Sequence, residues 1–202
     1  MVAPFLPDEV KHALAIAAPI ALDIFDRGAA PSAPAQLVTH ASAASSELAA
    51  ELDGAAEWLG VRAEEILLAA LGRTLGRTRG DGAVAVAVRS KAFGSPRAVT
   101  LLCAAGMPMG PSEMLQGAHN ALSDALSEAV SDAPADIALL LDGAVVASDT
   151  AALQIDVRRT ADALQVDWTY DAARFDAYSV EELAEQFGLA LIEITSDAGA
   201  PL

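Results

Sequence analysis

The chain has 202 residues, of which 53% are hydrophobic, and it carries a formal net charge of −16 at pH 7. A chain of this length can bury about 70% of the surface that it exposes when unfolded, so wholesale disorder is not expected. The negative charge repels phosphate groups, which argues against nucleic-acid binding and against docking on an anionic membrane surface.

The cysteine count and the N-terminus indicate a cytoplasmic protein. Cys103 is the only cysteine, so the chain can form no internal disulfide and no zinc site with paired cysteines. Asp8 and Glu9 stand where a secretory signal would need positive charge. The apolar run over residues 13–21 is too short to cross a bilayer. We therefore expect no membrane-spanning segment.

The first segment, residues 8–25, has apolar residues at helical spacing and predicts a helix. Pro19 removes an amide donor and should bend or split this helix. A linker is predicted after it, because residues 28–35 are rich in glycine, alanine and proline. The predicted organisation is an N-terminal helical arm and linker over residues 1–35 and a main domain over residues 36–202.

The main domain is expected to begin with a strand over residues 36–42, followed by two helices. Ser45 or Ser46 can cap the first helix, and Gly60 suits its C-terminal exit. The second helix is predicted over residues 63–77, with most of its apolar side chains turned toward the core.

Three short apolar segments, residues 84–88, 99–103 and 136–141, predict buried strands. Pro111 opens a further helix between the second and the third of them, and this helix should run to about Val130. The alternation of helices with buried strands is typical of an α/β fold.

The best local signal is a predicted antiparallel hairpin. Apolar and polar residues alternate over residues 153–158 and again over residues 164–170, on both sides of a short polar turn. Such alternation is typical of two paired strands with one face in water. The alternation places Trp168 on the inner face.

A final helix should follow the hairpin. Ser179 and Glu182 have the spacing of a capping box, and Phe187 lies on the apolar face that we expect to contact Trp168. Taken together, the elements predict an α/β fold, a two-layer sandwich with a mixed sheet.

Four groups of residues carry a family resemblance. They are Leu59-Gly60-Val61 with Leu67-Leu68-Ala69-Ala70; Val84 to Arg89; Met107-Pro108-Met109; and Tyr170-Asp171, Phe175-Asp176 and Glu181 to Phe187. In this order they resemble a helix pair, a strand, a Leu-Pro-Leu turn and a hairpin-to-helix closure in the C-terminal half of the condensation domains of nonribosomal peptide synthetases. That superfamily also contains chloramphenicol acetyltransferase and the acyltransferases of complex lipids.

The resemblance covers residues 37–195 and implies half of a two-part acyl-transfer scaffold. Condensation enzymes carry His-His-x-x-x-Asp-Gly in the other half, where the second histidine acts as general base or positions the acceptor amine. Here His12, His40 and His119 are isolated, and none is followed by Asp-Gly at that spacing. The family's Asn-Thr before the Leu-Pro turn is Ala105-Gly106 in this chain. The resemblance therefore implies that this half would supply a wall of the substrate tunnel but not the catalytic base.

His40 is the one candidate catalytic residue, because a histidine near its unperturbed pKa suits proton transfer at neutral pH. The alternative is a strand residue that meets solvent or a backbone partner. His119 is expected to be a polar residue on a helix surface. No histidine, cysteine or carboxylate grouping has the spacing of a metal site, so no metal is expected.

Arg73, Arg77 and Arg79 form a small basic group on an acidic chain and are the candidate cofactor-binding residues. They could meet a phosphate of coenzyme A or of a phosphopantetheine arm. The alternative is a local face of salt bridges. Gly72 and Gly76 lack the Gly-Lys-Ser/Thr end of a phosphate loop and instead indicate close helix packing or fraying of the helix.

Two functions are consistent with the sequence. In the first, the chain is a non-catalytic, condensation-domain-like half that forms a homodimer or pairs with a separate acyltransferase subunit. In the second, it is a split subunit or an excised domain of an enzyme that forms peptides or lipids by acyl transfer. The first needs no cofactor, whereas the second would use acyl-coenzyme A or phosphopantetheine. The missing histidine motif favours the first.

Overall fold

The computed structural model describes residues 20–28, 35–128, 135–143 and 151–202. Ten elements follow one another in these ranges: β1 (Leu37–Ala41), α1 (Ser46–Leu59), α2 (Ala63–Arg79), β2 (Gly82–Arg89), β3 (Arg97–Cys103), α3 (Pro111–Ser127), β4 (Ile137–Leu141), β5 (Leu153–Thr160), β6 (Ala163–Asp171) and α4 (Ala177–Asp197). Each predicted strand and helix of the main domain is present, with bounds that differ by a few residues.

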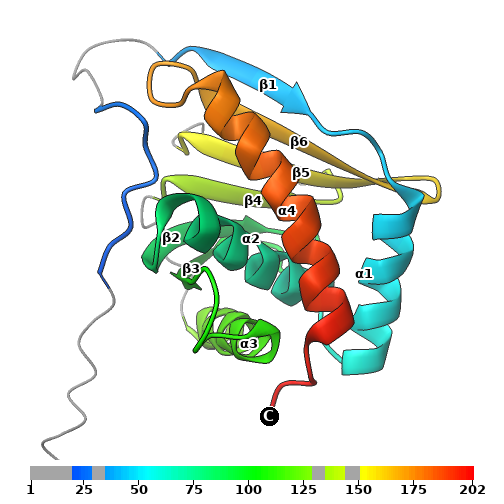
Figure 1. Ribbon diagram of the computed structural model, residues 1–202. Helices are drawn as coiled ribbons and strands as arrows, with labels where there is room; N and C mark the ends of the chain where they lie inside the picture. The colour runs from blue at the N-terminus through cyan, green and yellow to red at the C-terminus, as the bar shows by residue number, and fades with distance from the viewer. Residues whose placement is uncertain (1–19, 29–34, 129–134, 144–150) are drawn as a thin grey trace, which may run out of the picture.

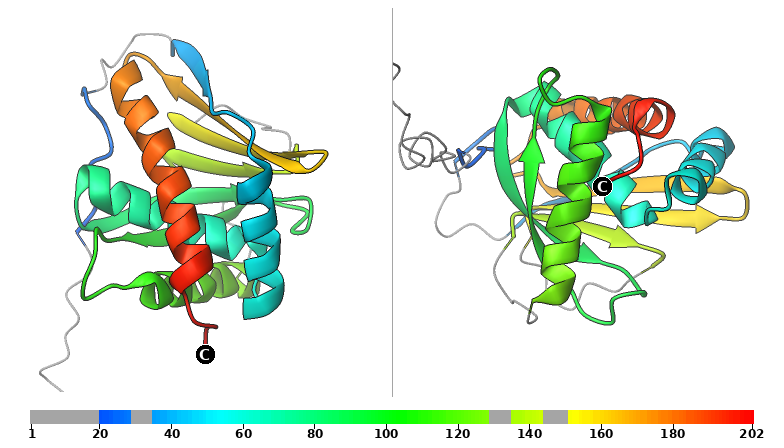
Figure 2. Two further views of the ribbon diagram at one scale, coloured as in Figure 1. Left: turned by 45° about the vertical axis from the view of Figure 1, so that its right-hand side comes forward. Right: turned by 90° about the horizontal axis from the view of Figure 1, so that it is seen from below.

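The strands form one mixed sheet in the order β1-β6-β5-β4-β2-β3. Strand β4 is parallel to both of its neighbours, and the other pairs are antiparallel. Helices α1, α2 and α4 cover one face of the sheet, while α3 runs beside β3 (Figure 1; Figure 2). The predicted two-layer α/β sandwich with a mixed sheet is confirmed.

Helix α2 lies at the centre of the molecule, and residues 64–76 are buried on all sides. Two glycines make this position possible. A Cβ atom at Gly72 would overlap the backbone carbonyl oxygen of Leu102, and one at Gly76 would stand 2.5 Å from the backbone nitrogen of Ala104. Both contacts are too close for a side chain, so the prediction of close helix packing at these glycines is confirmed.

The predicted hairpin has the expected register. Asp156 lies opposite Asp167, and Ile155 lies opposite Trp168. Since directly opposed residues share a face of the sheet, Trp168 points with Ile155 into the core, where both are buried. The inward alternation predicted from the sequence is confirmed.

The predicted capping box of the last helix is wrong. Helix α4 begins at Ala177, with Asp176 as the N-cap residue, so Ser179 and Glu182 lie inside its first two turns. Ser179 is therefore not the N-cap residue of this helix. The amide of Asp176 donates to Asp26, over 2.8 Å. A residue far away in the sequence therefore determines where this helix begins.

The predicted N-terminal helix is wrong over its last residues, 20–25, which form extended backbone. Ala21 pairs with Ala83 of β2 in a parallel bridge, and the amide of Leu22 donates to the Ala83 carbonyl over 2.8 Å. Ile24 is buried in the core, and the ring of Phe25 lies 5.4 Å from that of Phe175. Pairing with the end of β2 overrides the helical pattern here. The remainder of the predicted arm and most of the linker lie outside the described residues.

Candidate functional site

A groove of about 400 Å³ lies between β3 and α3. Alternate residues of β3 point inward and are buried, namely Val99, Leu101 and Cys103. The residues between them line the groove, namely Ala98, Thr100 and Leu102. On α3 the inward face is Met114, Leu115, Ala118 and Leu122. The groove thus lies on the side of β3 that faces away from the core.

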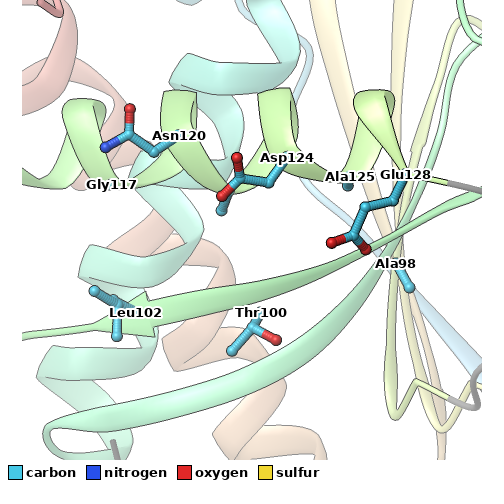
Figure 3. A pocket seen from close by; sticks show the side chains of 9 residues that line it. Ala98, Thr100, Leu102, Gly117, Asn120, Asp124, Ala125 and Glu128 are labelled. Carbon is cyan, nitrogen blue, oxygen red and sulfur yellow. The ribbon is translucent and has the colours of Figure 1, made fainter. Parts of the chain in front are cut away.

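Polar side chains from α3 border this groove. Asn120, Asp124 and Glu128 follow one another at intervals of about one helical turn. Figure 3 shows the carboxylate of Glu128 turned toward β3 near Ala98, while Asn120 and Asp124 lie along α3. Carboxylate and amide oxygens can accept hydrogen bonds from amine or amide donors. The lining residues include no histidine or cysteine. This arrangement can bind a polar group, and the carboxylates of Asp124 and Glu128 and the hydroxyl of Thr100 are the reactive groups among its lining residues.

A second groove, of about 620 Å³, lies on the neighbouring side of α3. The C-terminal tail forms one wall of it: the amide of Gly199 donates to Ser112 over 2.9 Å, and the amide of Leu202 donates to Gln116 over 2.7 Å. Gly117 and Asn120 line both grooves. Helix α3 is therefore bordered by two concave surfaces along much of its length.

His40, the candidate catalytic residue, lies in the edge strand β1 directly opposite Trp168 of β6. Its side chain is half-buried on the helix-covered side of the sheet, because Trp168 points to that side. It lines neither groove along α3. His40 therefore lies at the edge of the sheet and apart from both grooves.

His119 has a partner that its sequence position did not reveal. Its Nδ1 atom lies 3.2 Å from Oε2 of Glu65, a carboxylate that is almost fully buried at the start of α2. The same carboxylate oxygen accepts a hydrogen bond from the amide of Arg62. The pair joins α3 to α2. The two residues come from different helices, so no local spacing could have predicted this pair.

The three arginines proposed as a phosphate site do not form an open patch. Arg73 is 1% exposed, and its guanidinium donates to the carbonyl oxygens of Ala104, over 2.9 Å, and Met109, over 2.7 Å. Arg77 pairs with Glu193, which also lies 3.3 Å from Nε of Arg73. Arg79 pairs with Asp26 over 2.6 Å. The three arginines therefore have the alternative arrangement that the sequence allowed, a local set of salt bridges.

Four other cations form the basic region that the sequence analysis missed. Within the described residues, seven arginines form ion pairs with carboxylates, namely Arg27, Arg73, Arg77, Arg79, Arg158, Arg159 and Arg174. The other cations in these ranges are Arg62, Arg89, Lys91 and Arg97. They lie at the start of α2 and around the β2–β3 hairpin, and residues 82–112 contain no aspartate or glutamate. The absence of acidic residues from this stretch is the sequence signal that could have indicated these cations.

Two buried groups have shifted acidities. Burial, with a smaller contribution from the charge of Asp81, raises the pKa of Cys103 to about 12, so its thiol is not an activated nucleophile. Burial also raises the pKa of Asp156, although the charge of Arg158 opposes this shift. Arg158 bridges Asp156 and Asp167 on the face of the sheet away from the helices.

The described part of the chain contains neither a cluster of metal-ligating side chains nor a membrane-spanning helix. No group of three or more histidine, cysteine, aspartate or glutamate side chains there is placed to hold a metal ion. None of the helices in these ranges is both long enough and apolar enough to cross a membrane.

Comparison with known proteins supports the fold. No protein-family model matches the sequence, and no curated protein sequence matches it. The epimerization domain from the third module of tyrocidine synthetase B is similar in structure, with a TM-score of 0.67 at 11% identity over 93% of this chain and 56% of that one. The X-domain from teicoplanin biosynthesis has a TM-score of 0.67 at 18% identity, over 95% of this chain and 54% of its own.

A third similar structure is the condensation domain of the Monacolin K polyketide synthase MokA, with a TM-score of 0.61 at 8% identity, over 87% of this chain and 52% of that one. At such identities the likeness establishes the fold alone. The chain spans about half the length of these domains. Its fold is that of half of a condensation-type domain, as the sequence motifs predicted.

Proposed function

We propose that this chain is a non-catalytic condensation-domain-like half that acts in the cytoplasm by associating with another polypeptide, either a second copy or an acyltransferase subunit. The observation that carries the proposal is the fold: almost all of this chain superposes on about half of each similar domain. In the family that the sequence resembles, one half packs against the other. A single half therefore leaves a surface that suits a partner.

The chemistry of the described residues supports a role without catalysis. His40 is in an edge strand and away from both grooves, and His119, which lies beside Glu65, is not among the lining residues of either groove. Neither groove along α3 has a histidine or cysteine among its lining residues. General base catalysis contributes roughly 10²–10⁴-fold to rate, and the histidine motif that supplies the base in condensation enzymes does not occur in this sequence.

The proposal is tested by incubating the purified chain with acyl-coenzyme A donors and with amine and alcohol acceptors. We expect product at the background rate only. His40→Ala and His119→Ala are the informative variants, because each removes one imidazole from a different surface. Turnover that survives purification and is lost in His40→Ala, but not in His119→Ala, would assign catalysis to this chain and overturn the proposal.

A second candidate is a split subunit of an acyltransferase, which would bind coenzyme A or phosphopantetheine. The cations Arg62, Arg89, Lys91 and Arg97 favour it, because they form no ion pair with a carboxylate of the described residues, and guanidinium and ammonium groups suit phosphate. The test is titration of coenzyme A by calorimetry. Arg97→Gln should then weaken binding roughly tenfold, since a hydrogen bond to a charged group contributes about 1.5–3 kcal/mol.

The matched control for this titration is Arg159→Gln, which removes an equal charge from a pair with Asp53 on the far side of the sheet. It should leave coenzyme A binding unchanged. If the parent binds no coenzyme A, the second candidate fails. If the parent binds coenzyme A and neither variant affects the affinity, Arg97 is not part of the binding site.

A further inference from the structure

Strand β1 is a short edge of the sheet that carries no charged residue, apart from the titratable His40, and no proline. It pairs on one side with β6, and it is the end strand of the described sheet (Figure 1). Natural edge strands usually carry lysine, proline or a bulge that prevents pairing with another chain. The sequence of β1, Leu-Val-Thr-His-Ala, contains none of these. The strand is also free of acidic residues, although the chain carries a net charge of −16.

The backbone groups of β1 alternate between its two sides. The carbonyl of Gln36 accepts from the amide of Ala172, and the amide of Ser42 donates to the carbonyl of Val166. Both bonds lie on the β6 side, and in an antiparallel pair every second residue bonds to the same neighbour. The backbone amides and carbonyls of Val38 and His40 therefore point toward β6, whereas those of residues 37, 39 and 41 point outward.

The side chains at this edge are apolar and partly uncovered. Leu37 is 48% exposed and Val38 is 44% exposed. Val38 shares the inner face with Tyr170, which is buried, so the helices cover β6 but leave β1 partly open. The edge offers both backbone hydrogen-bonding groups and apolar surface, and it has no charge that would repel an identical edge.

We propose that a second copy of this chain pairs with β1 in antiparallel orientation about Thr39, so that one sheet continues through both copies. This inference names the surface for the self-association in the proposed function and rests on it. In this pairing Leu37 of one copy lies opposite Ala41 of the other, and Thr39 lies opposite its own equivalent. The two-fold axis is perpendicular to the sheet, so the helices of both copies lie on the same side.

One strand pair makes a small interface, so the dimer is expected to be weak. We expect a dissociation constant on the order of 10–100 µM. The net charge of each copy adds a long-range repulsion, which salt screens beyond about 8 Å at physiological ionic strength. The dimer should therefore be more stable at 0.3 M salt than at 0.05 M, the opposite of an interface built on ion pairs.

The experiment is sedimentation velocity of the full chain over a wide concentration range. Val38→Lys places a lysine on β1, and Leu102→Lys places the same charge on β3, the other edge strand, at a residue that is 40% exposed. We expect the parent and Leu102→Lys to dimerise alike, and Val38→Lys to dimerise at least tenfold more weakly. Circular dichroism and the melting temperature confirm that both variants fold.

Hydrogen exchange provides a second readout that does not depend on a variant. Raising the protein concentration should slow exchange of the amides of residues 37, 39 and 41 but not of those in β3. A parent that stays monomeric at several hundred micromolar overturns the inference while leaving pairing with a different subunit intact. A dimer that Leu102→Lys breaks and Val38→Lys does not would move the interface to β3, and the inference about β1 would be wrong.

Discussion

Trp168 of β6 and Phe187 of α4 meet edge to face, with their ring centroids 5.6 Å apart and their planes at 81°. Both side chains are buried, Trp168 completely. The contact joins the hairpin to the last helix and lies between the sheet and the helical layer. Edge-to-face pairs of this kind contribute about 0.5–1.5 kcal/mol beyond the burial of their area.

Trp168→Ala should lower the free energy of unfolding by about 3–5 kcal/mol, because it removes a buried aromatic side chain and leaves a cavity. Urea denaturation followed by circular dichroism measures the change. Trp58→Ala is the matched control, since Trp58 is 87% exposed on α1. It should change stability by less than about 0.5 kcal/mol. Equal effects of the two substitutions would mean that Trp168 is not part of the core.

Gly76→Ala should destabilise the protein, because the new methyl group would overlap the backbone of Ala104. Overpacking of this kind costs about 1–3 kcal/mol or more when backbone must move. At Gly54 in α1, a new methyl group would meet no atom within 4 Å, so Gly54→Ala should instead stabilise by about 0.5–1 kcal/mol. In thermal melts we therefore expect Gly76→Ala to lower the melting temperature and Gly54→Ala to raise it. A neutral Gly76→Ala would contradict the close approach of α2 and the chain after β3.

Arg73→Met tests the buried arginine that connects α2, the chain after β3 and α4. The variant keeps apolar volume but leaves the carbonyls of Ala104 and Met109 without their donor. Breaking a buried charged network by removing one partner costs about 3–5 kcal/mol. The control is Arg159→Met, which breaks an exposed pair with Asp53 and should cost less than about 1 kcal/mol. A stable Arg73→Met would show that these carbonyls find water instead.

The stability of the protein in acid should depend on Asp26. Burial alone would raise the pKa of this carboxyl, but hydrogen bonds from Arg79, the Asp176 amide and Ser179 outweigh it, so the pKa lies below its ordinary value of 3.8. The stabilisation is therefore complete above this ordinary value and is lost as the pH falls through the lower folded-state value. Asp26→Asn should be less stable than the parent at pH 7.

The difference between the parent and Asp26→Asn should close below about pH 4, where the unfolded carboxyl and then the folded one take up a proton. Urea titrations at a series of pH values between 7 and 2.5 measure it. Asp53→Asn, which removes an equal charge at an exposed carboxylate, is the matched control. A constant difference between the parent and Asp26→Asn across this range would mean that Asp26 stabilises the fold without being ionised.

The elements that the sequence predicted well have local causes. Ser45 caps α1 by accepting from the amide of Leu48 over 3.1 Å, and Gly60 ends it in the left-handed region at φ 66°. The alternation in β5 and β6 predicted a hairpin because burial of one face repeats every two residues. These patterns depend on neighbours in the sequence, so they can be read without the tertiary structure.

The candidate sites were predicted less well. Arg73 and Arg77 read as a basic patch because their partner, Glu193, belongs to the last helix. The pair of His119 and Glu65 likewise joins two helices. In each case the charge of a side chain was visible, but its partner was far away in the sequence. Whether a charged residue is paired decides what it can bind, and local pattern does not contain that information.

The sequence by itself determined the α/β class, the order of strands and helices, and the condensation-type half fold, because the spacing of apolar residues follows the periods of helix and strand. Tertiary structure alone decided that residues 20–25 extend along β2, that Asp26 rather than Ser179 governs the start of α4, and that β1 and β3 are the edges of the sheet. These features depend on backbone groups and charges that meet only after the chain has folded, when pairing and burial outweigh local preference.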